Sequence, residues 1–181
     1  MKKIDITFLP SIKGNYFDDD LIIDWCKKLN DSFDFINTYI PKNAEEAKIF
    51  LKKSNAAYGA LTKDLIGHCN DVQLLQAPQA APPPDFYYDE LINHPMIVTN
   101  FRGIYNDHIS HHILAMILSF SKSLNLYIHQ QSKRMWRPIT SDIGSTRYLP
   151  EMKIMIIGLG GIGDETARLC NYFGSEIIGV D

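Results

Sequence analysis

The stretch Gly158-Leu159-Gly160-Gly161-Ile162-Gly163 decides the fold of the C-terminal part of this chain. An apolar run over 152–157 precedes it and predicts a strand, and a helical pattern follows over 164–173. A second apolar run covers 176–180, and Asp181 comes directly after it. The order strand, glycine turn, helix, strand and acid predicts one parallel βαβ unit.

Three glycines of this turn have separate physical purposes. Gly158 permits a tight turn out of the strand, Gly160 lets the backbone approach a pyrophosphate, and Gly163 lets the helix pack closely on the strand. The helix N-terminus offers N–H groups to phosphate, and an acid at the distance of Asp181 accepts hydrogen bonds from the adenosine ribose. We therefore predict a dinucleotide site, with NAD favoured over NADP, formed by Gly158, Leu159, Gly160, Gly161, Ile162, Gly163 and Asp181.

The composition excludes several classes of partner. The net charge is −3 and the isoelectric point is near 6.0, which argues against nucleic acid or an anionic membrane surface. The longest apolar run, 113–118, is too short for a membrane span. The three cysteines lie far apart, and no signal peptide is recognisable at the start of the chain. We therefore expect a cytoplasmic protein with reduced thiols.

The first hundred residues alternate short apolar runs with helical patterns. Helices are expected at 21–29, 44–53, 62–67 and 85–92, the first of them capped by Asp18-Asp19-Asp20. Strands are expected at 4–9, 33–40, 56–61, 72–76 and 96–99. This alternation predicts an α/β fold with a parallel sheet wrapped by helices.

A different pattern follows Thr99. Residues 108–128 form the longest helical candidate, and its broad apolar stripe suggests packing between elements or against a partner subunit. Its histidines have metal-ligand spacing, but no cluster elsewhere in the sequence completes a site. We therefore expect no metal site and assign capping, interface or solvent roles to His108, His111 and His112.

The segment Val98-Thr99-Asn100-Phe101-Arg102-Gly103, followed by the long helix, the Trp136 loop and the glycine turn, resembles the D-isomer-specific 2-hydroxyacid dehydrogenases. The resemblance implies a flavodoxin-like substrate-side domain over 1–99. It further implies that residues 100–181 are the beginning, the first βαβ, of a Rossmann NAD-binding domain. It also implies a homodimer that forms through the long helix and the following loop.

The family transfers hydride between nicotinamide and a D-2-hydroxy or 2-keto acid. By the resemblance, the arginine, glutamate and histidine of that chemistry lie after the second strand of the nucleotide domain, so no catalytic residue is assigned here. We accordingly expect the chain to be a truncated, inactive piece of an NAD(P)-dependent oxidoreductase. The alternative is a non-enzymatic module that dimerises or binds a partner through the long helix, whose apolar stripe includes Ile109, Ile113, Met116 and Phe120.

The substrate side departs from the family pattern. There, backbone N–H groups of a small-residue turn after the fourth strand hold the substrate carboxylate, and the matching stretch here is 79–84. It carries Ala80 and Ala81 followed by three prolines, which have no N–H to donate. Either the carboxylate is held differently, or the turn is only a stiff surface feature. Arg102 is a further candidate for an anionic substrate, and a structural salt bridge is the other interpretation.

Overall fold

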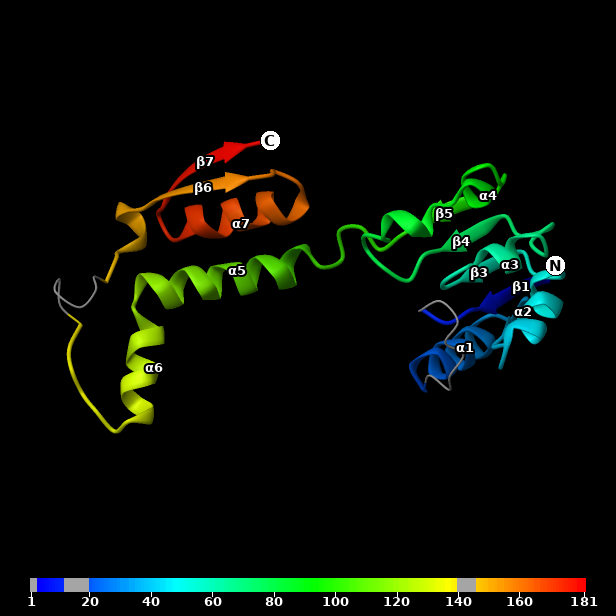
Figure 1. The fold of residues 1–181 in the computed structure, drawn as a ribbon, viewed down its shortest axis with the longest axis horizontal. Helices are drawn as coiled ribbons and strands as arrows, with labels where there is room; N and C mark the ends of the chain where they lie inside the picture. The colour runs from blue at the N-terminus through cyan, green and yellow to red at the C-terminus, as the bar shows by residue number, and fades with distance from the viewer. Residues whose placement is uncertain (1–2, 12–19, 140–145) are drawn as a thin grey trace. The chain divides into compact units, whose positions relative to one another are not determined.

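The computed structural model describes residues 3–11, 20–139 and 146–181. The chain divides into two compact units, Met1–Arg102 and Gly103–Asp181 (Figure 1). The sequence places the corresponding boundary after Thr99.

The first unit is built on a parallel sheet of five strands in the order β2-β1-β3-β4-β5. This is the strand order of flavodoxin-like sheets. Ile6 of β1 pairs with Thr38 of β2 on one side and with Ala56 of β3 on the other. The strands are β1 (Ile4–Phe8), β2 (Ile36–Tyr39), β3 (Ala56–Tyr58), β4 (Leu74–Gln76) and β5 (Ile97–Thr99). The predicted parallel α/β fold is confirmed.

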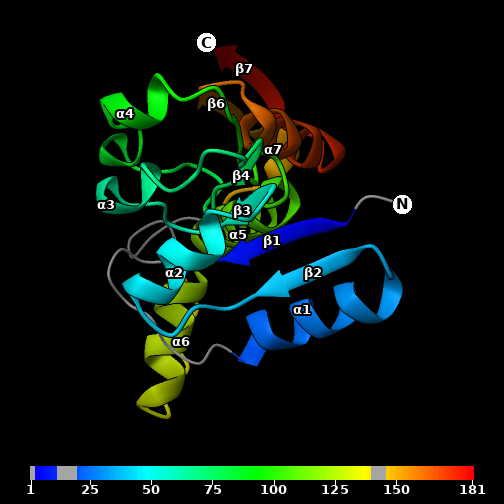
Figure 2. The ribbon, with the colours of Figure 1, turned by 90° about the vertical axis from the view of Figure 1, so that its right-hand side faces the viewer.

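Helices cover both faces of this sheet. They are α1 (Asp20–Ser32), α2 (Ala44–Leu51), α3 (Lys63–Ile66) and α4 (Asp89–Ile92), with a 3-10 turn at Pro84–Phe86. Figure 2 shows α1 running along β2, where Ile22 and Cys26 pack with Phe8. The larger core includes Leu9, Leu51, Leu61, Leu65 and Leu75, all fully buried. Phe8, the last residue of β1, thus packs with α1, while the next residue, Leu9, packs in the larger core. Successive side chains of a strand point to opposite faces of the sheet, so the two residues enter different cores.

The second unit contains a parallel pair of strands joined by a helix. These are β6 (Lys153–Ile157), α7 (Gly161–Tyr172) and β7 (Glu176–Val180), as the glycine-turn pattern predicts. The helix α5 (Asn106–Ser121) packs against α7, and a 3-10 turn, Leu149–Glu151, precedes β6 (Figure 1). The buried core is small and consists of Leu114, Leu149 and Cys170.

The single helix predicted over 108–128 is wrong, because the structure has two helices there. α5 ends at Ser121, and α6 (Leu124–Ser132) begins after Ser123, whose φ of 54° lies in the left-handed region. The Ser121 hydroxyl donates to the Leu118 carbonyl at 3.1 Å, the kind of local bond by which serine competes with the helix ladder. The Ser121 carbonyl then accepts from the Arg147 N–H at 2.6 Å, so the break is tied to the loop before β6.

Other expectations agree with the structure or lie beyond what it describes. α1 begins at Asp20, while the other proposed cap residues, Asp18 and Asp19, lie outside the described residues. The same holds for 140–145 within the predicted loop 130–150. Within the described ranges, every helix is too short or too polar to cross a bilayer.

Candidate cofactor-binding site

The glycine turn leaves β6 sharply. Gly158 has a φ of 93°, a conformation that side-chain-bearing residues rarely adopt, and its N–H donates to the Val180 carbonyl of β7 at 2.7 Å. Gly160 then serves as the N-cap of α7, with an extended backbone. The turn therefore joins β6 to α7 and is hydrogen-bonded to the carboxyl end of β7.

Two glycines of the turn differ in how much space surrounds them. A Cβ at Gly163 would collide with the Gly158 carbonyl oxygen, so the helix approaches the turn as closely as the sequence predicts. At Gly160 a Cβ would meet nothing within 4 Å. The absence of a side chain there is not needed for packing, and it leaves the backbone open to a ligand.

The first turn of α7 is available to an anion. Its N-cap has no side-chain hydrogen bond, so the capping that serine, threonine or aspartate usually provides is missing. The Asp164 N–H donates to the Gly160 carbonyl at 2.9 Å, and the N–H groups of the residues before it in α7 have no intrahelical partner. Open N–H groups and the positive end of the helix dipole are features that favour a bound anion.

Asp181 lies beside the same turn. Its Oδ1 accepts the Leu159 N–H at 3.0 Å, and the residue is exposed. This bond places a carboxylate at the end of β7, where the ribose of a dinucleotide is bound in Rossmann folds. The structure thus brings the predicted cofactor residues 158–163 and Asp181 together.

A cavity of about 400 Å³ lies beside the turn. It is formed by β6, the start of α7 and one face of α5, and its lining includes Ile113, Ile117, Ile156, Ile162 and Thr166. The Thr166 hydroxyl already donates to the Ile162 carbonyl at 2.7 Å. The side chains that line the cavity are therefore mainly apolar.

The substrate-side candidates lie apart from this turn in the chain. Ala80 is half-buried and Ala81 is exposed, in the segment after β4. Arg102 is exposed as well, and its backbone N–H donates to Asn100 Oδ1 at 3.0 Å. No ion pair joins its guanidinium to any residue in the described ranges, so the salt-bridge interpretation finds no support there.

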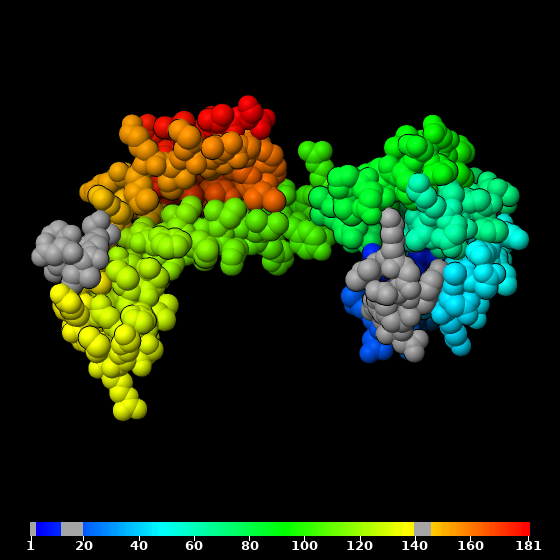
Figure 3. Space-filling model, in the orientation of Figure 1, coloured from blue at the N-terminus to red at the C-terminus, as the bar shows by residue number. Residues whose placement is uncertain are grey.

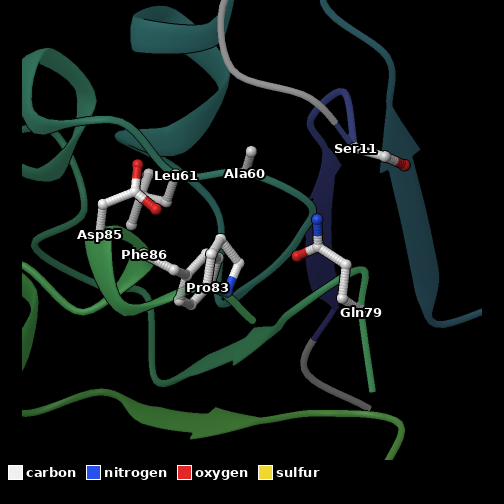
Figure 4. A pocket seen from close by; sticks show the side chains of 7 residues that line it. All are labelled: Ser11, Ala60, Leu61, Gln79, Pro83, Asp85 and Phe86. Carbon is white, nitrogen blue, oxygen red and sulfur yellow. The ribbon is translucent and has the colours of Figure 1, made fainter. Parts of the chain in front are cut away.

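Sequence reasoning missed a second cavity, of about 210 Å³, at the carboxyl edge of the five-stranded sheet. Figure 4 shows the Gln79 amide and the Asp85 carboxylate on either side of the Pro83 and Phe86 rings. Ser11, Ala60 and Leu61 complete the lining. These residues follow β1, β3 and β4, and the rule that ligands bind at this edge is the signal that identifies them.

In the part of the chain that the structure describes, the histidines and cysteines do not form a reactive centre. His108, His111 and His112 are exposed on α5, and the described residues contain no group of three side chains able to hold a metal ion. Burial raises the pKa of the Cys69 thiol to about 12 and also raises the pKa values of Cys26 and Cys170. All three thiols are therefore protonated at neutral pH and are poor nucleophiles.

Comparison with known proteins relates this chain to one group of dehydrogenases. The model of the D-isomer specific 2-hydroxyacid dehydrogenase NAD binding domain matches residues 114–181. A D-lactate dehydrogenase of Streptococcus pyogenes serotype M1 is 26% identical over 145 residues, which cover 78% of this chain and 42% of that protein. Residues 114–181 thus match the NAD binding domain of the D-isomer specific 2-hydroxyacid dehydrogenases.

Solved structures of this family share the fold. A family member from Aeromonas salmonicida subsp. salmonicida A449 has a TM-score of 0.75 at 21% identity, over 99% of this chain and 54% of that one. The NAD-complexed enzyme of Lactobacillus delbrueckii ssp. bulgaricus has a TM-score of 0.75 at 11% identity, over 98% and 53%. A D-lactate dehydrogenase of Treponema pallidum has a TM-score of 0.70 at 20% identity, over 98% of this chain and 53% of that one. The chain thus spans about half the length of these relatives.

Proposed function

We propose that this chain contributes a nucleotide site and a substrate-side domain to an NAD-dependent oxidoreductase that acts on the CH–OH group of a D-2-hydroxy acid. One observation carries the proposal. A glycine turn with open space above Gly160 begins α7, and a carboxylate, Asp181, is hydrogen-bonded to that turn.

The residues of this turn fit NAD. The N–H groups at the start of α7 would bind the diphosphate, while Asp181 would accept hydrogen bonds from the adenosine ribose. A carboxylate at that position repels the 2′-phosphate of NADP, so we propose NAD as the cofactor. Bound NAD supplies the hydride acceptor, and the chain's own residues hold and orient it.

We propose that residues 1–99 form the substrate-side domain and that residues 100–181 belong to the NAD-binding domain. A 2-hydroxy or 2-keto acid would bind at the carboxyl edge of the five-stranded sheet. The cavity next to Gln79 lies at this edge, and the segment that contains Ala80 and Ala81 follows β4, as Gln79 does. The Arg102 guanidinium is exposed and has no ion pair within the described ranges, so it is suited to an anionic substrate. None of these side chains is assigned to the hydride-transfer step.

The matched glycine pair Gly160 and Gly67 tests the cofactor site. A Cβ at either position meets nothing within 4 Å, and neither has a positive φ, so alanine strains neither. We expect Gly160→Ala to weaken NADH binding at least tenfold in isothermal titration, because its methyl group enters the diphosphate space. Gly67→Ala should bind NADH as the wild type does. Equal affinities in all three proteins would refute the site.

An absorbance assay with NADH and a panel of 2-keto acids tests the reaction class. The protein that contains this chain should oxidise NADH with at least one 2-keto acid. Stereochemical analysis of the product should then show the D-hydroxy acid. An L-hydroxy acid product, or turnover only with substrates lacking a 2-keto group, would contradict the proposed activity.

A homodimer is the second proposal, and exposed apolar side chains on α5 and α6 favour it. Phe120 is 65% exposed and Ile128 is 62% exposed, and α6 contains no buried residue at all. Trp136, 78% exposed, stacks on Tyr127 of α6.

We expect a dimer in light scattering, and we expect Phe120→Asp to convert it to a monomer. Ile92→Asp, at an equally exposed position on α4, is the control and should remain dimeric. A monomeric wild type would refute this proposal and leave the cofactor site untouched.

A further inference from the structure

Asn106 is the first residue of α5 and lies next to the glycine turn. Gly103, with a φ of 96°, turns the chain into α5, and its carbonyl accepts the Asn106 N–H at 3.3 Å. The amide of Asn106 lies directly over Gly161, the first residue of α7. A Cβ at Gly161 would come within 3.0 Å of the Cγ, Oδ1 and Nδ2 atoms of Asn106. The two helices therefore begin side by side, with this amide between them.

The amide of Asn106 has no partner among the described residues. Its side chain is half-buried, and none of its polar atoms is hydrogen-bonded in that part of the chain. It does not cap its own helix, because the N-cap of α5 is Tyr105 and no side chain bonds there. An asparagine amide has two N–H donors and one acceptor, so an unpaired amide next to open helix N–H groups is suited to an oxyanion.

We propose that Asn106 is a further cofactor-binding residue, which donates from Nδ2 to the diphosphate of NAD. The inference rests on the cofactor site proposed above. It also gives Gly161 a purpose that the turn alone does not explain. Any larger residue at 161 would push the Asn106 amide away from the start of α7. Glycine at this position therefore lets Nδ2 of Asn106 lie next to the proposed phosphate site.

Asn106→Asp is the sharpest test, because it keeps the shape of the side chain and replaces the donor with a negative charge. An acid in the first turn of a helix is favourable, so α5 itself should not be weakened. We expect affinity for NADH and for ADP-ribose, which also carries the diphosphate, to fall at least tenfold in titration calorimetry. Adenosine, which has no phosphate, should bind within twofold of the wild type in ligand-observed NMR. Asn106→Ala should lose three- to tenfold on the diphosphate ligands.

Asn125→Asp provides the matched control, since it makes the same change at an exposed position near the start of α6. It should leave the affinities for all three ligands and the melting temperature unchanged. If the wild type binds neither NADH nor ADP-ribose, the proposed cofactor site itself fails. If the wild type binds both and Asn106→Asp binds them equally well, or loses adenosine to the same extent, the role of Asn106 is refuted.

Discussion

The two parallel sheets of this chain differ in how fully helices and neighbouring strands cover them. In the first unit, Leu9, Leu51 and Leu75 are completely buried, and both sheet faces carry helices. In the second unit, Met155 is 60% exposed and Ile157 is 82% exposed, although both lie in β6. The first unit therefore derives its stability from a closed core, while the second keeps apolar surface and a glycine turn open.

This difference matches the roles proposed for the two units. A binding site that must admit a dinucleotide needs accessible N–H groups and little side-chain cover, which the turn at 158–163 provides. Regions that bind ligands are commonly drawn from the less stable parts of a structure. We therefore expect the second unit to open more readily and to gain stability from cofactor, and the first to be indifferent to it.

The largest expected effect is on the core of the first unit. Leu75→Ala removes a fully buried side chain of β4 and should lower the free energy of unfolding by about 3 kcal/mol. Leu74→Ala, at the neighbouring position that is 40% exposed, should cost under about 1 kcal/mol. Urea denaturation followed by circular dichroism measures both. Similar losses from the two variants would show that the first core is not closed.

A smaller effect is expected at Gly163, where the second unit is tightly packed. Gly163→Ala places a methyl group against the Gly158 carbonyl and should destabilise this unit by about 1–3 kcal/mol. The same variant should lose NADH binding, because the turn must move. Gly160→Ala should lose binding with an unchanged melting temperature, so the pair separates packing from ligand access. A Gly163→Ala protein with normal stability and affinity would contradict the close approach.

The smallest effect concerns the rates at which two buried thiols are labelled. Cys69 of the first unit and Cys170 of the second are both fully buried, and burial raises the pKa of each thiol. Labelling therefore proceeds through opened forms, and its rate reports local opening. In single-cysteine proteins made by serine replacement, Cys170 should react about tenfold faster than Cys69 with a thiol reagent at pH 8. Equal rates would remove the contrast between the units.

Sequence reasoning was most successful where periodicity and local turns decide the structure. Every predicted strand of the first unit is present, because short apolar runs separated by helical patterns leave few alternatives to a parallel sheet. The sequence also predicts the glycine turn, because the conformation of Gly158 and the close packing of Gly163 follow from the motif itself. The predicted participation of Ala80, Ala81 and Arg102 in substrate binding remains a prediction.

Features that depend on tertiary contacts were missed. Nothing in the local sequence marks Ser123 for a positive φ, because the break after α5 is tied to Arg147, 26 residues after Ser121 in the chain. The contact between Asn106 and Gly161 joins two helix starts that are likewise distant in sequence. The stretch 79–84 is expected to face the substrate, but the sequence does not predict the cavity beside Gln79, because its lining comes from segments that follow three separate strands.

Hydrogen exchange with and without saturating NADH tests the central claim most directly. The account predicts that amides of residues 158–166 exchange more slowly with NADH, while those of β3 and β4 in the first unit are unchanged. Asn106→Asp should reduce that protection, and Asn125→Asp should not. If 158–166 exchange equally fast in both conditions, or if the added protection falls only on the five-stranded sheet, the glycine turn does not bind the cofactor.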